Sequence, residues 1–462
     1  MPTRDPARQD AFTPLFTDLY QLTMLQAYFK EGMDENAVFD LFVRRLKHRN
    51  FLIACGLESV LQYLESLAFS DDAIDYLAAQ DSFDDDFLDY LSDFHFTGDV
   101  YALREGTPVF RDEPIVEVVA PIGEAQLVET FLLNQITVQT GLASKAARVV
   151  QAARQGGGSR VVADFGMRRM HGTDAAMKAA RAYHIAGVDS TSNVWAGQVY
   201  GLPITGTMAH SYVEAHDTEM DAFRAFARLY PETTLLVDTY DTLDGVRKVV
   251  ELADEWGDDF KVRAIRLDSG DLAALAKQAR QILDEAGLDN VQIFASSSLD
   301  EHKITELLDR DAPIDGFGVG TRMGTMADQP YLDSAYKLAG YAGQPRMKLS
   351  KEKSNLPGRK QIYRQFDGDT AARDVIAAHD ESVEGTPLLE PVMKDGERTE
   401  AGQPHSLDRI RDYAEAQRQR LPERLQRIEP ANPPYDVTLS NRLQSELEQT
   451  REELEAKMDV QS

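Results

Sequence analysis

From about residue 160 onward, short apolar runs alternate with helical patterns roughly every 25 to 30 residues, as in successive strand–helix units. The apolar runs lie at 160–165, 202–208, 233–238, 262–267, 291–295 and 314–319, with a further short run near Val188. Helical spacing of apolar residues falls between them, for example at 217–229, 243–256, 272–286 and 300–308. This alternation predicts parallel strands closed into an α/β barrel in the middle of the chain.

The loops that follow these runs are rich in residues that carry chemistry. The run at 202–208, predicted to be a buried strand, ends in Gly206-Thr207-Met208-Ala209-His210-Ser211, which places a histidine at the mouth of a small-residue loop. The other runs lead into Gly166-Met167-Arg168-Arg169-Met170-His171-Gly172, Thr239-Tyr240-Asp241-Thr242, Asp268-Ser269-Gly270-Asp271 with Arg266 just inside, Ser296-Ser297-Ser298 and Gly318-Val319-Gly320-Thr321-Arg322. Because the active sites of such barrels lie at the carboxyl ends of the strands, we expect these loops to meet at one rim.

Each of these motifs also has a purely structural explanation. Asp268, Asp271 or the serine run could cap the helix that follows, the two glycines could mark a tight turn, and an arginine could belong to a structural ion pair. Taken singly, each motif favours that explanation. Their joint occurrence at one predicted rim favours a functional site instead.

The residue types at this rim predict recognition of a phosphorylated anion. The Gly-Val-Gly-Thr and serine stretches offer backbone N–H groups and hydroxyls to a phosphate. Arg168, Arg169, Arg266 and Arg322 suit carboxylate or phosphate recognition, and Asp268 and Asp271 are hard oxygen ligands suited to Mg²⁺ held jointly with substrate phosphates. His210 is the rim group that can act as a nucleophile or an acid–base near neutral pH. We therefore expect an enzyme acting on a phosphorylated small molecule that also carries a carboxylate or pyrophosphate.

The charge of the chain restricts its partners. With 49 basic and 77 acidic residues among 462, the net charge is −28, which argues against a nucleic-acid binder because such a protein needs a basic face. An anionic substrate must then be captured by a local cluster of arginines and lysines. Arginine is much commoner than lysine, and the acidic residues are spread along the chain, a composition that resembles proteins of salt-loving cytoplasms.

The number of cysteines and the length of the apolar runs indicate the kind of cellular environment in which the protein works. Cys55 is the single cysteine, so an intrachain disulfide and a cysteine-rich metal site are excluded, and its apolar surroundings predict a core residue. No apolar run approaches membrane-spanning length, and no signal peptide precedes Phe12. We therefore expect a cytoplasmic protein.

The remaining patterns suggest how the domains are divided. We expect an N-terminal α/β domain at 12–122, the barrel with the active site at 123–340, a C-terminal part at 341–445 and a charged helix or tail at 446–462. Strands expected at 347–350, 360–365, 374–378 and 388–392 are interpreted as returning to the N-terminal strands, which makes that smaller domain discontinuous. A long helical pattern at 123–155 with a break near Gly141 carries Lys145 and Arg148, expected to be surface charges or anion ligands.

Several motifs in order resemble the nicotinate phosphoribosyltransferase family over about residues 12–445. They are Thr17-Asp18-Leu19-Tyr20-Gln21, Asp164-Phe165-Gly166 with Arg168-Arg169, Gly206-Thr207-Met208-Ala209-His210-Ser211, Asp238-Thr239-Tyr240-Asp241-Thr242, Ile265-Arg266-Leu267-Asp268-Ser269-Gly270-Asp271, Gly318-Val319-Gly320-Thr321 and Tyr336-Lys337-Leu338. The resemblance implies an irregular TIM-like α/β barrel beside a second, smaller α/β domain, usually in a homodimer with shared active sites. It also implies that nicotinate and 5-phosphoribosyl 1-diphosphate are joined to give nicotinate mononucleotide and pyrophosphate, driven by ATP hydrolysis, in NAD biosynthesis and salvage.

The resemblance also assigns roles to individual residues. His210 matches the histidine that ATP phosphorylates, so the protein is expected to pass through a phosphohistidine. Tyr20, Thr207 and Arg266 match positions that hold nicotinate, with Tyr20 arriving from the partner subunit. Thr321 matches a position that binds the phosphoribosyl phosphate. The chemistry of the rim residues, rather than the resemblance, adds Arg168, Arg169, Ser298, Gly318 and Gly320 as further ligands of the phosphoribosyl diphosphate, and Asp268 and Asp271 as ligands of Mg²⁺.

Rival functions remain open from the residues alone. A nicotinamide phosphoribosyltransferase would need a carboxylate that accepts the amide in the ring pocket. Quinolinate phosphoribosyltransferases need more cations around the ring, have a shorter chain and use no phosphorylated histidine. A non-catalytic relative that binds a nucleotide is disfavoured because His210, Arg266 and both rim aspartates occur together, and a barrel aldolase lacks a lysine at a strand end, since Lys261 precedes its strand.

Overall fold

The computed structural model of the protein describes residues 12–349 and 355–461. They belong to two compact units, of which unit 1 combines the chain up to Thr140 with the chain from Tyr331 onward, and unit 2 spans Gly141–Pro330. The N- and C-terminal parts therefore fold together. The boundaries lie at 140 and 330 rather than at the expected 122 and 340, because helix α6 (Glu129–Ala153) runs through the first and strand β12 (Ser334–Tyr341) pairs with an N-terminal strand.

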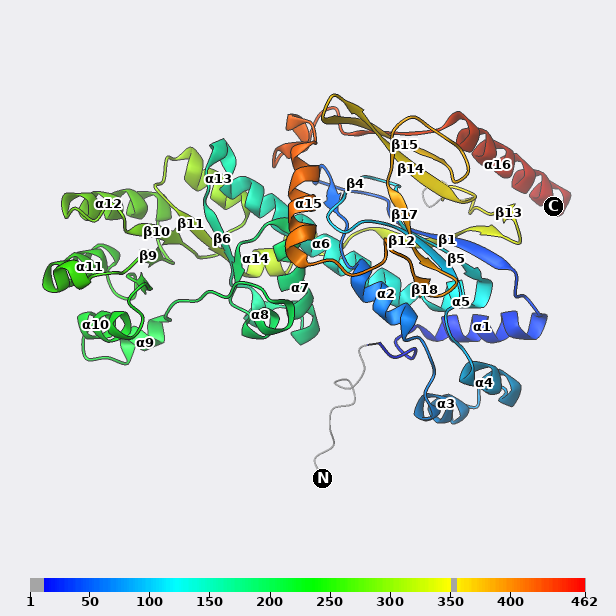
Figure 1. Ribbon diagram of the computed structural model, residues 1–462, viewed down its shortest axis with the longest axis horizontal. Helices are drawn as coiled ribbons and strands as arrows, with labels where there is room; N and C mark the ends of the chain where they lie inside the picture. Colours follow the sequence, from blue (N-terminus) through cyan, green and yellow to red (C-terminus); the bar gives the residue numbers. More distant parts are fainter. Residues whose placement is uncertain (1–11, 350–354, 462) are drawn as a thin grey trace. The chain divides into compact units, whose positions relative to one another are not determined.

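Unit 1 is built on an antiparallel sheet with the strand order β13-β12-β1-β5-β3-β17-β18 (Figure 1). Its strands besides β12 are β1 (Asn36–Val43), β3 (Asp99–Leu103), β5 (Pro114–Pro121), β13 (Gln344–Pro345), β17 (Leu389–Lys394) and β18 (Glu397–Arg398). Strand β17 of the C-terminal part pairs with β3 of the N-terminal part. The predicted strand at 347–350 is absent from the described residues 347–349, and Ser350 lies outside the described residues.

A second sheet of unit 1 contains strands of the C-terminal part alone, in the order β16-β14-β15-β19. They are β14 (Lys360–Asp367), β15 (Thr370–Ala378), β16 (Thr386–Pro387) and β19 (Asp436–Leu439), and a separate pair joins β2 (Leu52–Ile53) to β4 (Pro108–Val109). The helices of this unit are α1 (Leu19–Glu31), α2 (Leu57–Glu65), α3 (Asp71–Ala78), α4 (Asp85–Ser92), α5 (Ile122–Leu127), α15 (Leu407–Gln419) and α16 (Asn441–Gln461).

Aromatic side chains organise the core of unit 1. The rings of Phe39 and Tyr336 stack at 4.8 Å across β1 and β12, and those of Tyr63 and Phe131 stack at 3.9 Å between α2 and α6. Tyr336 also donates a 2.7 Å hydrogen bond to the carbonyl of Ala125, so its buried hydroxyl is satisfied. Phe39 and Tyr336 come from the two halves of this discontinuous unit, so burial of their aromatic surfaces stabilises the halves against each other.

A buried ion pair joins neighbouring strands of the second sheet. The guanidinium of Arg364 on β14 lies 2.6 Å from the carboxylate of Asp374 on β15, and both side chains are almost completely buried. Tyr435 donates a 2.9 Å hydrogen bond to the same carboxylate, and Arg364 donates to the carbonyl of Pro108. Each charged group is therefore both paired and hydrogen-bonded, as burial of a charge requires.

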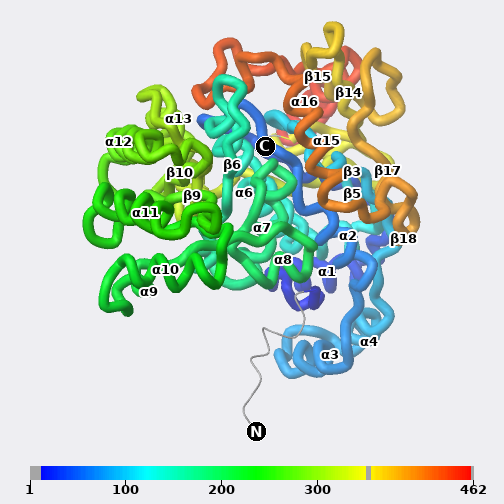
Figure 2. The backbone as a smooth tube through the Cα atoms, turned by 60° about the vertical axis from the view of Figure 1, so that its left-hand side comes forward, coloured from blue at the N-terminus to red at the C-terminus, as the bar shows by residue number. Residues whose placement is uncertain are grey.

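Unit 2 is an α/β unit whose strands form one parallel sheet in the order β7-β6-β11-β10-β9-β8. The strands are β6 (Val161–Asp164), β7 (Ser190–Thr191), β8 (Thr234–Leu236), β9 (Ala264–Leu267), β10 (Gln292–Ala295) and β11 (Gly316–Val319). The helices are α7 (Thr173–Ala186), α8 (Val194–Tyr200), α9 (His210–Glu214), α10 (Glu219–Leu229), α11 (Thr242–Trp256), α12 (Leu272–Glu285), α13 (Glu301–Asp309) and α14 (Thr321–Gly324). Helices α11, α12 and α13 lie beside the strands in Figure 1, and α9 packs beside α10 in Figure 2.

The stretch at 202–208 is not the buried strand that the sequence predicts. Its link to the sheet is a single parallel bridge between Ile204 and Thr191 of β7, and Ile204 and Gly206 are exposed. Within the described residues, the parallel ladder therefore forms an open half-barrel that ends at β7 and β8. The apolar run is real, but Pro203 lacks a donor and Gly206 lacks a side chain to pack, so the run contributes only this bridge.

The helices differ from expectation in one further place. Helix α6 continues through Gly141 without the predicted break, and Lys145 and Arg148 on it are buried rather than on the surface. Tertiary packing of the helix outweighs the modest cost of one interior glycine. No helix in the described ranges combines the length and apolar character that a membrane span requires.

Arg364→Met is expected to destabilise unit 1, because it leaves the buried Asp374 carboxylate without its cation. Removing one partner of a buried pair costs about 3–5 kcal/mol of the free energy of unfolding. Urea denaturation followed by circular dichroism measures the change. The control is Arg224→Met, which breaks the half-exposed Arg224–Glu255 pair and should leave the midpoint unchanged. Equal midpoints for the two variants would contradict this account of the buried pair.

Candidate active site

Arg266, near the carboxyl end of β9, connects three loops of the predicted rim. Its Nε donates a 3.0 Å hydrogen bond to Ser296 Oγ, and its terminal nitrogens contact Thr207 Oγ1 and, at 3.5 Å, the Asp268 carboxylate. The guanidinium also lies 5.8 Å from the centre of the Phe165 ring. Arg266, Thr207 and Asp268 were all predicted to be site residues, and the structure brings them together.

His210 begins α9 and faces the same cluster. Its Nδ1 lies 3.1 Å from Thr239 Oγ1, in the loop that follows β8, and its Nε2 lies 3.8 Å from Asp268 Oδ2. The imidazole is partly exposed, with 39% of its side-chain surface accessible. With Nδ1 engaged by a hydroxyl, Nε2 is the ring nitrogen available to a substrate.

Asp238 belongs to this cluster, although the sequence did not assign it a role. Its Oδ2 accepts hydrogen bonds from the Asp268 backbone N–H, at 2.9 Å, and from the Ser269 hydroxyl, at 2.6 Å. Its Oδ1 is buried and has no hydrogen-bond partner among the described residues. The sequence signal that could have identified Asp238 is its position directly after a buried strand. Asp238 also belongs to a family motif, but no function was predicted for it there.

The Gly320 loop brings two predicted phosphate ligands together. Arg169 Nη1 lies 3.4 Å from Thr321 Oγ1, and a Cβ on Gly320 would lie 3.1 Å from the carbonyl oxygen of Phe165. Gly318 is different, because it is buried within β11 and a Cβ there would lie 2.5 Å from the Phe165 ring. Close packing of that ring is sufficient to explain the glycine at 318.

Ser298 lies in an exposed loop with an unusual backbone. Ser297 and Ser298 have φ values of 98° and 47°, in the left-handed region that residues with a Cβ rarely occupy. The adjacent Ser296 is buried, and its hydroxyl is held by Arg266 and by the Asp268 carboxylate. Backbone strain of this kind persists where the surroundings hold the loop in place.

The remaining predicted rim residues have other surroundings. Asp271 caps α12 by accepting the Ala274 N–H, and its second oxygen lies 2.8 Å from Arg310. Arg168 is exposed and forms no hydrogen bond or ion pair with the residues that the structure describes. Arg322 pairs with Asp300 at 2.6 Å, so one of its nitrogens is already engaged.

The donor set fits Mg²⁺ only in part. Within the described ranges, no group of three or more His, Cys, Asp or Glu side chains could hold a metal ion by itself. The Asp268 carboxylate and the unpartnered Oδ1 of Asp238 are nevertheless hard oxygen ligands, and Mg²⁺ is commonly held by one or two carboxylates together with substrate phosphates. Asp271 is already engaged by Arg310, which makes it the weaker of the two predicted ligands.

Tyr20 belongs to unit 1, near the start of α1, and not to the cluster around Arg266. Its side chain is about half exposed, as are the neighbouring Phe16 and Leu19. Partial burial and the carboxylates of Glu129 and Asp18 raise the pKa of Tyr20 to about 12. The phenol is therefore neutral at physiological pH and presents an uncharged ring.

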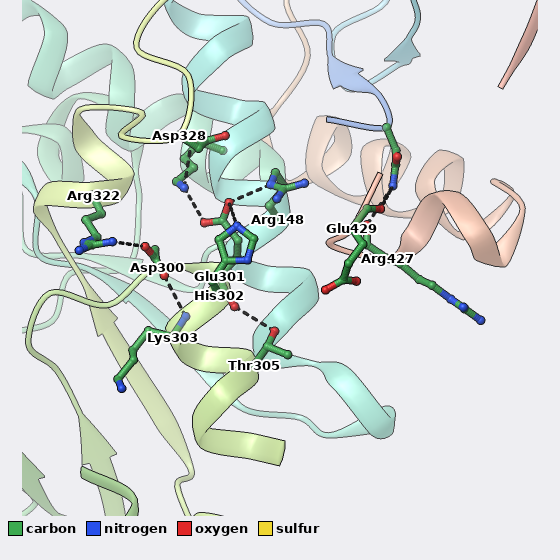
Figure 3. A network of polar contacts seen from close by, with 12 residues as sticks. Arg148, Asp300, Glu301, His302, Lys303, Thr305, Arg322, Asp328, Arg427 and Glu429 are labelled. Carbon is green, nitrogen blue, oxygen red and sulfur yellow. Dashed lines mark hydrogen bonds and ion pairs between the residues drawn. The ribbon is translucent and has the colours of Figure 1, made fainter. Parts of the chain in front are cut away.

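A buried network of charges lies at the base of α13 in unit 2 (Figure 3). Glu301 is fully buried and accepts hydrogen bonds from Lys145 Nζ at 2.5 Å and from Arg148 Nε at 2.8 Å. Lys145 Nζ also lies 3.0 Å from Asp328. Burial by itself would raise the pKa of the Glu301 carboxyl, but the two cations outweigh burial and hold that pKa below its usual range.

Comparison with known proteins places these motifs in a family. The chain matches the family descriptions of the nicotinate phosphoribosyltransferase N-terminal domain at residues 15–137, the family itself at 161–357, and its C-terminal domain at 382–447. A Mycobacterium tuberculosis nicotinate phosphoribosyltransferase, pncB2, is 51% identical over 438 residues, covering 95% of this chain and 94% of the relative. The chain belongs to the nicotinate phosphoribosyltransferase family.

Further relatives agree with this assignment. A nicotinate phosphoribosyltransferase of Bacillus subtilis is 44% identical, covering 81% of this chain and 78% of its own. The crystal structure of human nicotinic acid phosphoribosyltransferase matches with a TM-score of 0.81 and 27% identity, covering 94% of this chain and 99% of that one. A nicotinate-nucleotide pyrophosphorylase from Pyrococcus furiosus matches with a TM-score of 0.74 and 25% identity, covering 91% and 99%. The family that the sequence motifs predict is thereby confirmed.

Proposed function

We propose that this protein is an ATP-dependent nicotinate phosphoribosyltransferase of NAD biosynthesis and salvage. It joins nicotinate to 5-phosphoribosyl 1-diphosphate, giving nicotinate mononucleotide and pyrophosphate. The observation that carries the proposal is the cluster of Thr207, His210, Arg266 and Asp268, which lies at one rim of a chain that belongs to this family.

In the transfer step, the ring nitrogen of nicotinate attacks the ribosyl C1 while the bond from C1 to pyrophosphate breaks. Arg266 and Thr207 hold the nicotinate carboxylate, which fixes the direction of the ring nitrogen. Arg169, Thr321, Ser298 and Gly320 receive the 5-phosphate. Arg168 is exposed to solvent and is available to the same anion. Gly318, within β11, supports the Gly320 loop from below. Mg²⁺, bound with the diphosphate, would neutralise the negative charge that develops on pyrophosphate, with Asp268 and Asp238 as the better placed carboxylates and Asp271 as a third.

His210 couples ATP to this reaction as a phosphohistidine. Thr239 occupies Nδ1, so Nε2 attacks the γ-phosphorus of ATP, the bond to the ADP oxygen breaks, and ADP leaves. Water later cleaves the P–N bond and releases phosphate. While the phosphoryl group is present, it lies beside Asp268, the residue that contacts both His210 and Arg266, so the two half-reactions share one set of side chains.

The protein is further proposed to act as a homodimer in the cytoplasm. Tyr20 from one subunit stacks on the pyridine ring in the site of the other. This arrangement is supported by exposed large apolar side chains at the start of α1, namely Leu19 and Tyr20, with Phe16 just before the helix, and on α8, namely Val194, Trp195 and Val199. A contact that covers such surfaces removes apolar area from water. The use of ATP and the sugar diphosphate, both metabolites of the cytoplasm, supports that location. Unit 2 is proposed to represent the irregular α/β barrel of the family, and unit 1 its smaller α/β domain.

The proposed reaction predicts that nicotinate mononucleotide forms from nicotinate, phosphoribosyl diphosphate and Mg²⁺, faster with ATP than without. His210→Asn should remove the stimulation by ATP and leave a slow basal transfer, because the asparagine amide cannot be phosphorylated. Product is measured by liquid chromatography, with nicotinamide as the competing substrate. A preference for nicotinamide would replace the proposal with nicotinamide transfer, and no product from either base would indicate a non-catalytic relative.

Shared active sites predict that two impaired variants restore ATP-stimulated activity when they are mixed. Tyr20→Ala and His210→Ala each damage one contribution to every site of their own homodimers. A mixed dimer contains one site with native Tyr20 and native His210, so activity should return after subunit exchange. Each variant incubated alone is the control. If mixing never raises activity although mixed dimers form, Tyr20 serves its own subunit's site or none.

The acidic composition predicts stabilisation by salt, as in proteins of salt-loving cytoplasms. A net charge of −28 opposes the compact state by self-repulsion, and ions screen that repulsion. The melting temperature should rise across a KCl series up to molar concentration. A melting temperature that stays flat or falls with KCl would contradict the halophilic interpretation.

A further inference from the structure

The two loops proposed to receive the 5-phosphate are each followed by a residue that contacts the same buried lysine. The serine loop at 296–298 leads into α13, whose first residue is Glu301. The loop at Gly320 and Thr321 leads through α14 to Asp328. Lys145 Nζ lies 2.5 Å from the Glu301 carboxylate and 3.0 Å from that of Asp328, so one ammonium group connects the ends of both loops.

The serine loop needs such support because its backbone is strained. Ser297 and Ser298 are exposed and have positive φ, a conformation that persists only when neighbouring structure holds it. On one side, the loop is held at Ser296 by Arg266 and Asp268. On the other side, Leu299 is buried, and the loop ends at Asp300 and Glu301.

Asp300 gives a second connection between the two loops. One oxygen accepts the Lys303 backbone N–H and so caps α13, and the other lies 2.6 Å from Arg322, the residue after Thr321. The serine loop and the Gly320 loop are thus joined near the surface by Asp300 and Arg322, and below it by Lys145. Both connections start at the N-terminus of α13, one at its cap Asp300 and one at its first residue Glu301.

We propose that Lys145 is a positioning residue, which holds Glu301 and Asp328 so that the serine loop and the Gly320 loop together receive the 5-phosphate of the sugar diphosphate. The inference rests on the proposed function, since it assumes that these loops bind that phosphate. A buried ion pair contributes little net stability compared with apolar side chains of the same size. Lys145 therefore acts on the geometry of the phosphate site, and it reaches the substrate only through the two carboxylates.

The same unit contains a second lysine that bridges two carboxylates and can serve as a control. Lys248, whose side chain is 25% exposed, lies 2.9 Å from the buried Glu219 on α10 and 2.7 Å from the exposed Asp244 on α11. These contacts join two helices and involve neither phosphate loop. Lys248→Met therefore removes the same kind of bridge from unit 2 without changing the support of the serine loop.

The test compares Lys145→Met, Asp328→Asn and Lys248→Met in the full-length protein. For each we measure KM for phosphoribosyl diphosphate, KM for nicotinate, kcat, the melting temperature, and the Kd of ribose 5-phosphate by calorimetry. Lys145→Met leaves Glu301 paired with Arg148, so the chain should still fold. We expect KM for phosphoribosyl diphosphate and Kd of ribose 5-phosphate to rise about tenfold, as when a binding group is displaced at a distance, while KM for nicotinate stays unchanged.

Asp328→Asn removes the other end of the bridge and should raise the same two constants by a smaller factor. Lys248→Met should change neither. A fall in kcat and melting temperature at constant KM in Lys145→Met, or an equal rise in KM in Lys248→Met, would assign Lys145 to stability alone and overturn the inference. If Lys145→Met does not fold, an unchanged KM in Asp328→Asn overturns it equally.

Failure of the proposed function would be recognised separately. A wild-type protein that makes no nicotinate mononucleotide but binds ribose 5-phosphate more tightly than Lys145→Met would refute the reaction and keep the role of Lys145. A wild-type protein that makes the product but binds ribose 5-phosphate no better than Lys145→Met would keep the reaction and refute the inference. If the wild-type protein does not bind ribose 5-phosphate at all, the phosphate site on which the inference depends does not exist, and the inference is refuted.

Discussion

The hydrogen bonds of Arg266 are the interaction on which the candidate site depends. The residue lies on β9, inside a parallel sheet whose carboxyl ends all face one edge, and it contacts Thr207, Ser296 and Asp268 from three separate loops. Because its guanidinium is planar and rigid, it fixes the positions of these three partners relative to one another. His210 then joins the cluster through Asp268. A lysine at this position would offer a point charge and would not define the same directions.

The lysine and arginine side chains of this acidic chain occur in two kinds of environment, one buried and one exposed. Lys145, Lys360 and Arg364 are almost completely buried, and each contacts a carboxylate of another element. Arg168 and Arg169, by contrast, lie on the surface beside the rim, where an anionic substrate must be attracted against the overall negative field. The same residue types thus have two functions, which burial separates: buried cations fix the relative positions of elements, and exposed ones are available to ligands.

The strand–helix rhythm of unit 2 could be predicted because it depends on local periodicity, and strands β6, β8, β9, β10 and β11 lie where the apolar runs predicted them. The prediction of a buried strand at 202–208 was wrong. An apolar run forms a strand only where a neighbouring strand is available, and here Thr191 alone supplies a bridge. The prediction that Lys145 is a surface charge or an anion ligand failed for a related reason. The helical position of Lys145 was correct, but burial depends on the unit packed around α6, which no local pattern reports.

The sequence by itself determined the family, the parallel α/β character of the middle of the chain and the residue types at the rim, because motifs and periodicity are local and survive without knowledge of contacts. Only the tertiary structure decided which of these residues meet. It joined His210 to Thr239 and Asp268, left Asp238 with an unpaired buried oxygen, engaged Asp271 with Arg310, and placed Glu301 under the serine loop. These are contacts between residues far apart in the chain, and they depend on how strands and helices pack, which the spacing of residues along one segment does not specify.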